Sequence, residues 1–204
     1  MTSRTVSREA LVARGPITGA SIVPMWISGP TQYSYGVSQN LYMADYSTIP
    51  GNFGWLDLPS GITESWNDCL SGVPMSEADL KLLFARPGET FWSGLTGQKV
   101  GQWTSDLNSR ITRAAGAPWT GETFDQHSPN NPRIMVVPMV TWLGGTGTGA
   151  RFRIDRFGAF WLDQLKGTGS NKYIYGRFLH YAIPGADMDV LASDNGVNAV
   201  RLVR

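Results

Sequence analysis

Residues 150–165 read ARFRIDRFGAFWLDQL, and this run decides the fold class. Phe152 and Ile154 stand at even positions, whereas Phe157, Ala159 and Trp161 stand at odd positions. Because the side chains of a β-strand alternate between two faces, these residues share one face only if the strand absorbs an extra residue between them. The run therefore predicts one long strand with a β-bulge near Asp155 and Arg156.

Further strands are predicted on both sides of this run. Alternating or continuous apolar residues bounded by Gly, Pro or polar turns are typical of strands. They occupy residues 17–28, 32–44, 51–58, 133–143, 173–183 and 197–203. The stretch GGTGTG (144–149) leads into a strand and lacks the Lys-Ser/Thr pair of a phosphate-binding loop, so we interpret it as a hairpin connection.

Two of these strands echo each other. SIVPMWI (21–27) and MVVPMVT (135–141) are both apolar, and both carry a central proline. Proline within sheets is confined to edge strands and bulges, so the pair predicts two sheet edges or one pocket covered by a loop. Chance similarity between apolar strands is the alternative interpretation.

Helical signals lie between the N-terminal and C-terminal strands. Residues 62–71 are bounded by glycines, and Ser76 begins a variant of the capping box. In residues 97–115 apolar side chains recur at helical spacing, and Arg110 and Arg113 place positive charge near the negative end of that helix's dipole. The patterns together predict an α+β, mainly β fold: an antiparallel β-sheet or sandwich with two or three helices inserted between the N-terminal and C-terminal strands.

Length and charge limit the class of protein. The 204 residues suffice for one well-buried domain, which we place at residues 17–204 behind a flexible arm, residues 1–16. The net charge of +1 builds no basic field, so nucleic acid is not an expected partner. Charged residues make up 16%, below the usual share of about 25%, which favours a large contact surface or an exterior environment.

No membrane span is expected in this sequence. No stretch approaches the ~20 apolar residues that a span needs, and the N-terminal residues lack the apolar core of a secretory signal. We therefore expect any anchor or signal to be absent from this chain.

The residue types that can bind metals are scattered along the sequence. His127 and His180 have no second His or Cys at ligand spacing, and we expect His180 to be a half-buried structural residue. Asp187, Asp189 and Asp194 are weak calcium candidates through their carboxylate oxygens, but their spacing is not that of an EF-hand, and a solvated loop is the preferred interpretation.

Catalytic patterns are missing as well. The sequence contains no Gly-x-Ser-x-Gly elbow, and nothing selects an acid–base pair from Glu64, Glu89 and Glu122. The single cysteine, Cys69, is interpreted as a small buried apolar residue rather than a reactive thiol. The sequence thus predicts no catalytic residue, no metal and no cofactor.

Four segments in register resemble a known family. They are GNFGWLD (51–57), KVG (99–101) with LNSR (107–110) after it, the long run 133–167, and GRF (176–178). In this order they resemble TadG-like proteins, which are associated with the assembly of Flp (tight-adherence) pili. The resemblance implies an extracytoplasmic domain, at the cell surface or secreted, and supplies no catalytic residues. The family begins with a transmembrane anchor and favours a partner for this cysteine, and the present sequence shows neither.

Two functions follow as predictions. The first is a non-catalytic structural or interaction module of the bacterial cell envelope or an extracellular appendage, or an accessory subunit of a larger assembly, with protein partners or a second copy of the chain. The resemblance and the abundant Tyr and Trp favour it. The alternative is a carbohydrate-binding β-sandwich module, whose exposed rings would be Trp92, Trp119 and Trp142. An enzyme with an unrecognised arrangement is the third hypothesis.

The aromatic stretch GNFGWLDL (51–58) separates the first two hypotheses. We interpret Phe53, Trp55 and Leu56 as core residues, because buried aromatic residues are the ordinary case. The alternative is an exposed surface on which a glycan or a partner stacks.

Overall fold

The computed structural model describes residues 11–16, 19–29, 32–41, 54–58, 60–62, 65–92, 100–167, 173–184 and 197–203. In these ranges the helices are α1 (Trp66–Ser71), α2 (Glu77–Leu82) and α3 (Val100–Ala115). The strands are β1 (Leu11–Pro16), β2 (Ala20–Ser21), β3 (Ile27–Ser28), β4 (Ser38–Leu41), β5 (Phe84–Ala85), β6 (Thr90–Trp92), β7 (Ile134–Gly144), β8 (Arg151–Lys166), β9 (Tyr173–Leu179), β10 (Tyr181–Pro184) and β11 (Val197–Val203).

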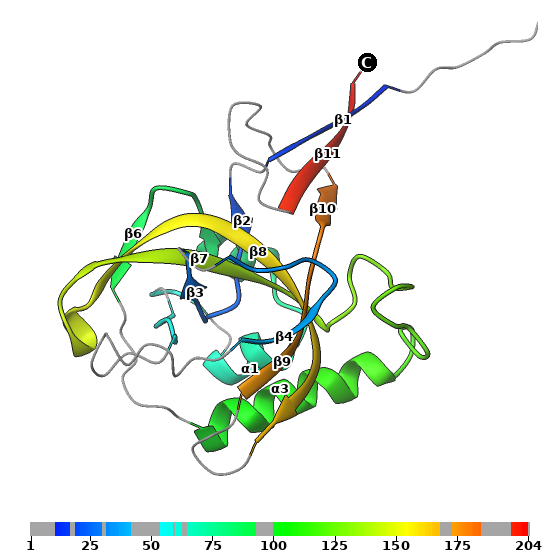
Figure 1. Ribbon diagram of the computed structural model, residues 1–204, viewed down its shortest axis with the longest axis horizontal. Helices are drawn as coiled ribbons and strands as arrows, with labels where there is room; N and C mark the ends of the chain where they lie inside the picture. The colour runs from blue at the N-terminus through cyan, green and yellow to red at the C-terminus, as the bar shows by residue number, and fades with distance from the viewer. Residues whose placement is uncertain are drawn as a thin grey trace, which may run out of the picture.

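Six strands form the central sheet, in the order β3-β7-β8-β9-β4, with β6 also paired to β8. β7 and β8 are a long antiparallel hairpin (Figure 1), joined through the 3₁₀ turn Gly147–Gly149. The predicted hairpin connection is therefore confirmed, as are the antiparallel sheet and the helices inserted before it. The described residues do not show two sheets packed face to face, so the sandwich stays a prediction.

β8 carries the predicted bulge. Met139 pairs with Arg156 and Val140 pairs with Ile154, so Asp155 is the extra residue. Beyond the bulge, odd-numbered residues occupy the face that even-numbered residues occupy before it. Five residues from both sides of the bulge therefore join a single buried cluster. Those residues are Phe152, Ile154, Phe157, Ala159 and Trp161. One skipped position thus lets a 16-residue strand keep one apolar face.

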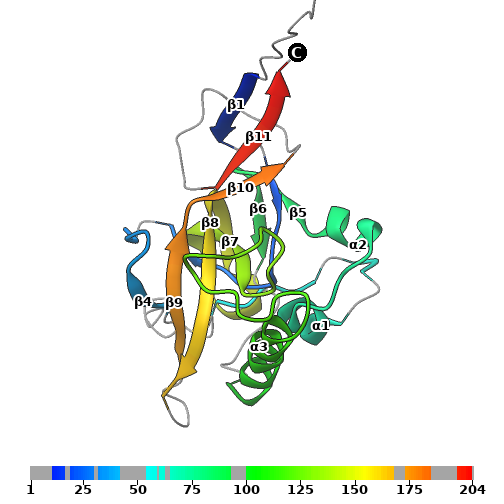
Figure 2. The ribbon, with the colours of Figure 1, turned by 90° about the vertical axis from the view of Figure 1, so that its right-hand side faces the viewer.

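The central sheet is buried on both faces. Phe160 and Leu162 point to the opposite face of β8 and pack in a second cluster with Trp103 and Leu107 of α3. Figure 2 shows α1 and α3 on one side of the sheet. Burial on both faces explains why FGAFWL (157–162) is a continuous apolar run rather than an alternating one. Each fully buried Phe or Leu in it contributes about 1.5–3 kcal/mol.

Helix α1 begins later than the sequence predicts. Ser65 is its N-cap, and a full capping box joins Ser65 to Asp68: each side chain accepts a hydrogen bond from the other's backbone N–H. The helix therefore starts at Trp66 rather than at residue 62. It ends at Gly72, whose φ of 70° is the left-handed conformation that favours glycine at this position.

The other two helices follow their sequence signals more closely. Ser76 caps α2, its hydroxyl oxygen accepting a hydrogen bond from the backbone N–H of Asp79 at 3.1 Å. α3 is described from Val100, and residues 97–99 of its predicted range lie outside the described residues. Trp103, Leu107 and Ala114 are buried, which confirms the predicted apolar stripe.

The N-terminal strands are shorter than predicted. The range 17–28 contains β2 and β3 with an irregular segment between them, and the range 32–44 contains only β4 within its described part. In 51–58 the described residues form no strand, only a bridge between Trp55 and Met25. Pro24 explains the interruption, because the backbone around it bonds to the aromatic stretch instead: Trp26 N donates to Gly54 O, and Leu56 N donates to Pro24 O.

The two proline-bearing segments lie side by side. β3 pairs in parallel with β7, and the carbonyls of Val136 and Val140 both accept hydrogen bonds from the first segment, donated by Val23 N and Gly29 N. Because backbone polar groups alternate along a strand, the missing N–H of Pro138 faces the irregular segment around Pro24. It therefore costs no hydrogen bond to β8.

The two ends of the described chain pair with each other. β1 runs antiparallel to β11, from Leu11 opposite Val203 to Pro16 opposite Asn198, and β10 joins the other edge of β11. This three-stranded sheet projects from the central sheet (Figures 1 and 2). The predicted arm, residues 1–16, thus contains a strand over 11–16, and residues 1–10 lie outside the described residues. The predicted strand 173–183 is divided at His180 into β9 and β10.

Candidate functional site

A long loop, residues 117–132, connects α3 to β7 without regular secondary structure. The carboxylate of Glu122 holds its second half. It accepts hydrogen bonds from the backbone N–H of Ser128 at 2.9 Å, from the Ser128 hydroxyl and from the Asn131 amide at 2.7 Å. These hydrogen bonds lower the pKa of Glu122. Long loops held by their own side chains are usually functional.

The same loop is fixed onto the C-terminal strands. The guanidinium of Arg177 lies 4.0 Å from the ring centroid of Phe124 and makes two hydrogen bonds to Asp163, at 3.0 and 3.1 Å. The hydroxyl of Tyr181 donates to the carbonyl of Pro129 at 2.6 Å. The loop therefore has a defined shape over the body of the protein.

A groove of about 390 Å³ lies between this loop, the connection from α1 to α2, and strands β2, β7 and β10. We name it the loop groove. Much of its wall is aliphatic or proline side chains, among them Ile22, Val73, Pro74, Leu80 and Ile134. Its polar lining residues are Ser21, Arg110, Trp119, Asn130, Asn131 and Tyr181, and no Asp or Glu belongs to the described lining.

Arg110 is the charged residue of the loop groove, and it is only 6% exposed. Its Nε donates to Leu70 O at 2.6 Å, its Nη2 to Cys69 O at 2.7 Å and its Nη1 to Pro132 O at 2.8 Å. Burial lowers its pKa to about 10, so the guanidinium keeps its charge at neutral pH. The sequence predicts that Arg110 and Arg113 complement the dipole of their own helix, and Arg113 lies in its last turn. The hydrogen bonds of Arg110 reach the last carbonyls of α1, which lie at the negative end of that helix.

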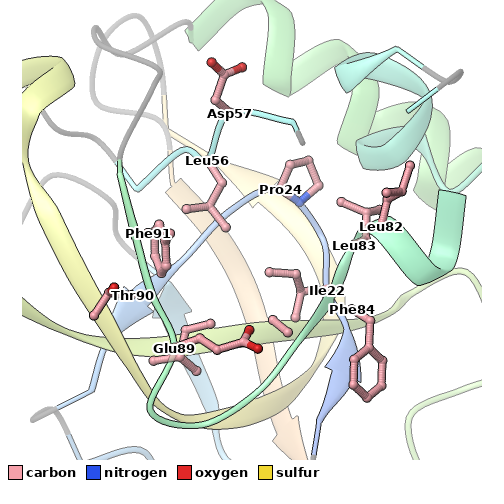
Figure 3. A pocket seen from close by; sticks show the side chains of 12 residues that line it. Ile22, Pro24, Leu56, Asp57, Leu82, Leu83, Phe84, Glu89, Thr90 and Phe91 are labelled. Carbon is pink, nitrogen blue, oxygen red and sulfur yellow. The ribbon is translucent and has the colours of Figure 1, made fainter. Parts of the chain in front are cut away.

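A second hollow, of about 170 Å³, adjoins the loop groove. We name it the α2 hollow. Ile22 and Leu83, which are joined by a hydrogen bond from Ile22 N to Leu83 O, line both hollows and separate them. Figure 3 shows Pro24, Leu56 and Phe91 around it, with the carboxylate of Asp57 at the rim and directed away from the hollow.

Exposed apolar side chains line these two hollows. Leu80 and Leu82 are each 40% exposed, and Phe84 is 38% exposed. Leu80 lines the loop groove, whereas Leu82 and Phe84 line the α2 hollow. We name these three residues the α2 ridge. Exposed apolar groups that adjoin apolar hollows mark contact surfaces.

Of the predicted stacking residues, Trp92 and Trp142 come to the same end of the central sheet. Trp142 pairs with Phe152, and Trp92 pairs with the preceding residue, Arg151, on the other edge of β8. Trp142 is 42% exposed, and its indole N–H donates to Gly145 O at 3.1 Å. The side chain of Trp92 lies outside the described residues.

Trp119 lies at the other end. It lines the loop groove together with Ile134, the first residue of β7, and its indole N–H donates to Asn130 Oδ1 at 3.4 Å. The eight positions from Ile134 to Trp142 span about 26 Å of strand. Trp119 and Trp142 therefore do not form one flat platform.

The calcium candidates that the sequence suggests stay a prediction, because Asp187, Asp189 and Asp194 lie outside the described residues. No three His, Cys, Asp or Glu side chains form a metal-binding group among the residues that the structure describes. His180 is exposed and stacks on Tyr35, with ring centroids 4.1 Å apart. The prediction that His180 is half-buried is wrong, because the residue stands in the break between β9 and β10.

The remaining sequence candidates have structural partners or lie outside the described ranges. Cys69 is buried, as predicted. Trp55 and Leu56 are core residues, at 0% and 7% exposure, which confirms that interpretation, while Phe53 lies outside the described residues. Of the three glutamates, Glu64 also lies outside, Glu122 holds the loop, and Glu89 accepts a hydrogen bond from the backbone N–H of Arg86.

Sequence reasoning missed the α2 ridge, although a signal was present. LKLLF (80–84) places four large apolar residues within five positions at the end of a six-residue helix. A short amphipathic helix buries one stripe of its surface, and only Leu83 of the four is buried. An apolar density that exceeds one stripe predicts exposed apolar surface.

Comparison of the chain with protein-family models, with curated proteins and with solved structures gives no match. Among the helices of the described ranges, none combines the length and the apolar character that crossing a bilayer requires.

Proposed function

We propose that this chain is a non-catalytic interaction module that binds another protein, or a second copy of itself, through the α2 ridge. It belongs to the bacterial cell envelope or to an extracellular appendage, as a structural part or an accessory subunit of a larger assembly. The observation that carries the proposal is the exposure of Leu80, Leu82 and Phe84 within five residues, beside an apolar hollow. The extracytoplasmic placement rests on the resemblance to TadG-like proteins.

The free energy gained by covering the α2 ridge limits how a partner can bind. Covering three apolar side chains that are about two-fifths exposed contributes about 2–4 kcal/mol. This is too little for a stable complex, which also has to offset the entropy lost on association. A partner therefore has to insert an apolar side chain into the α2 hollow as well, where Pro24, Leu56 and Phe91 would surround it.

Site-specific photo-crosslinking in the producing bacterium tests the proposal. A photoreactive residue at Leu82 is expected to give an adduct of one defined mass, identified by mass spectrometry as one protein or as a dimer of the chain. The same residue at Thr112, on the exposed polar side of α3, is the matched control and is expected to give none.

The variant Phe84→Glu gives the decisive comparison. It places a charge on the ridge, so the Leu82 adduct is expected to disappear, and circular dichroism of the variant checks that the chain stays folded, since the Phe84 ring also packs on Gly19. Equal adducts from positions 82 and 112, or an adduct that survives Phe84→Glu, would refute the interaction site.

A carbohydrate-binding β-sandwich module is the second candidate, and one observation favours it. Trp142 exposes two-fifths of its surface at the end of the β7–β8 hairpin, with its indole N–H fixed by Gly145. A fixed, exposed indole is suited to stacking on a sugar ring. Calorimetric titration with soluble cell-wall oligosaccharides is expected to show binding that Trp142→Ala abolishes and that Trp119→Ala leaves intact. Equal affinities of the unsubstituted chain and the two variants for the oligosaccharide would show that Trp142 does not bind it.

A further inference from the structure

The loop groove contains one full positive charge and no negative one among its described lining residues. The charge is that of Arg110, 94% buried by its 6% exposure. No carboxylate forms an ion pair with it in the described part of the chain. Buried charges are normally paired, so this imbalance requires an explanation.

Carbonyl groups satisfy part of the guanidinium. An arginine has five N–H donors, and three of them bind the carbonyls of Leu70, Cys69 and Pro132. Carbonyl dipoles offset some of the charge, but they carry no net charge of their own. Two N–H donors are left without a hydrogen bond to any described residue. Asn130, at the exposed rim of the same groove, adds an amide donor, since its Oδ1 already accepts from Trp119.

We propose that the loop groove binds a small organic acid that has an apolar body. The carboxylate takes the remaining N–H donors of Arg110, with Asn130 at the rim, because guanidinium groups match carboxylates in shape and charge. The apolar body lies against Trp119, Val73 and Ile134. The volume of about 390 Å³ falls within the range of small-molecule sites, about 300–1,000 Å³.

The apolar wall separates this ligand from a simple inorganic anion. Inorganic phosphate would satisfy the charge but would leave Val73, Leu80 and Ile134 without apolar contact. An uncharged analogue would cover the wall but would leave the charge unpaired. The site therefore requires both parts of the ligand. This inference does not depend on the proposed protein contact, because of the three α2 ridge residues only Leu80 lines the loop groove.

Nuclear magnetic resonance titration of the full chain tests the site. The probes are 3-phenylpropanoate, its uncharged amide 3-phenylpropanamide, and inorganic phosphate. The acid is expected to give saturable shifts in the amides of residues 72–75 and 130–131 and in the indole N–H of Trp119. It is expected to bind about tenfold more tightly than either control, because only the acid combines a charge-assisted hydrogen bond with apolar contact. Equal affinities, or no saturable shift up to about 10 mM, would overturn the proposal.

Three surface variants locate the bound charge without touching Arg110. Leu80 and Leu82 have the same exposure, on the same helix, but only Leu80 lines the loop groove. Leu80→Glu is expected to weaken binding of the acid on the order of threefold, and Leu80→Lys to strengthen it similarly. Leu82→Glu changes the net charge equally and is expected to have no effect. Equal effects of Leu80→Glu and Leu82→Glu would place the carboxylate elsewhere.

Discussion

Replacing Arg110 with methionine tests how the two short elements, α1 and the loop 117–132, are held to α3. Methionine has a similar length and is accepted in apolar surroundings, but it donates no hydrogen bond. The substitution leaves three carbonyl oxygens without their donor, those of Cys69, Leu70 and Pro132. Each unsatisfied buried carbonyl costs about 1–3 kcal/mol.

Two effects reduce the total. Removing the guanidinium also removes the cost of burying a charge, and water in the adjoining loop groove can reach some of the freed carbonyls. We therefore expect a net loss of about 3–5 kcal/mol in the free energy of unfolding. For a chain of this length each kcal/mol shifts the melting temperature by about 2–4 °C, so the expected decrease is about 6–20 °C.

Urea denaturation at pH 7, followed by circular dichroism, measures the difference. Arg113→Met is the matched control, because Arg113 is exposed on the same helix, one turn nearer its end. Its effect is expected to stay within about 0.5 kcal/mol. If the two variants have the same midpoint, the three carbonyl bonds do not hold α1 and the loop in the way that the structure indicates.

Three further perturbations test other parts of the fold. An added Cβ at Gly176 would overlap the carbonyl oxygen of Trp161, so Gly176→Ala is expected to lower the melting temperature by several degrees. A Cβ at Gly149 would meet no atom within 4 Å, so Gly149→Ala is the control and is expected to leave the melting temperature unchanged. Hydrogen bonds hold the pKa of Glu122 below its ordinary 4.5, so its carboxylate stabilises the fold above that pH and loses this effect as the pH falls through the lower folded pKa. In Glu122→Gln the urea midpoint is therefore expected to depend less on pH between about pH 5 and 3. The same pH dependence in the variant and the unsubstituted chain would contradict this. Deleting Asp155 removes the bulge and turns the residues before it to the other face of the sheet, so this variant is expected to lose cooperative unfolding. Asp155→Ala keeps the register and is expected to lower the free energy of unfolding by about 1–3 kcal/mol, because it removes the hydrogen bond from Thr141. Similar thermal unfolding curves for the two variants would refute the role of the bulge.

The bulge in β8 could be predicted from sequence because its cause is local. The change of parity between Ile154 and Phe157 lies within one strand, and no distant partner is needed to infer an extra residue. The cap of α2 at Ser76 was predictable for the same reason, since the side chain and the N–H that it accepts from are three residues apart.

The role of Arg110 could not be predicted, because its partners are distant along the chain. Its three hydrogen bonds join residues that are 40, 41 and 22 positions away. A cation near the end of a helix satisfies the local dipole rule, and that rule does not identify the distant carbonyl groups that Arg110 binds. The loop groove depends on the same packing of remote segments. The sequence pointed to it only through the candidate Trp119 and through the two proline-bearing segments, whose residues Ile22, Val23 and Val136 line it.

The N-terminal strands show a third case, in which a local signal lost to a distant one. Residues 17–28 have the composition of one strand, but Pro24 interrupts the ladder. The backbone beside it then bonds to Gly54 and Leu56, about thirty positions along the chain. Such a cross-connection replaces regular pairing by an irregular one that buries Trp26 and Trp55.

The pairing of β1 with β11 has a mechanical consequence. Leu11 and Val203 lie opposite each other at one end of the paired strands. A force that pulled these two residues apart would load the pairs one after another, because the bonds between antiparallel strands run across the strand direction. The pair of strands β1 and β11 would separate at low force from Leu11 and Val203 as far as Pro16 and Asn198. The β7–β8 hairpin would carry no tension until these two strands had separated.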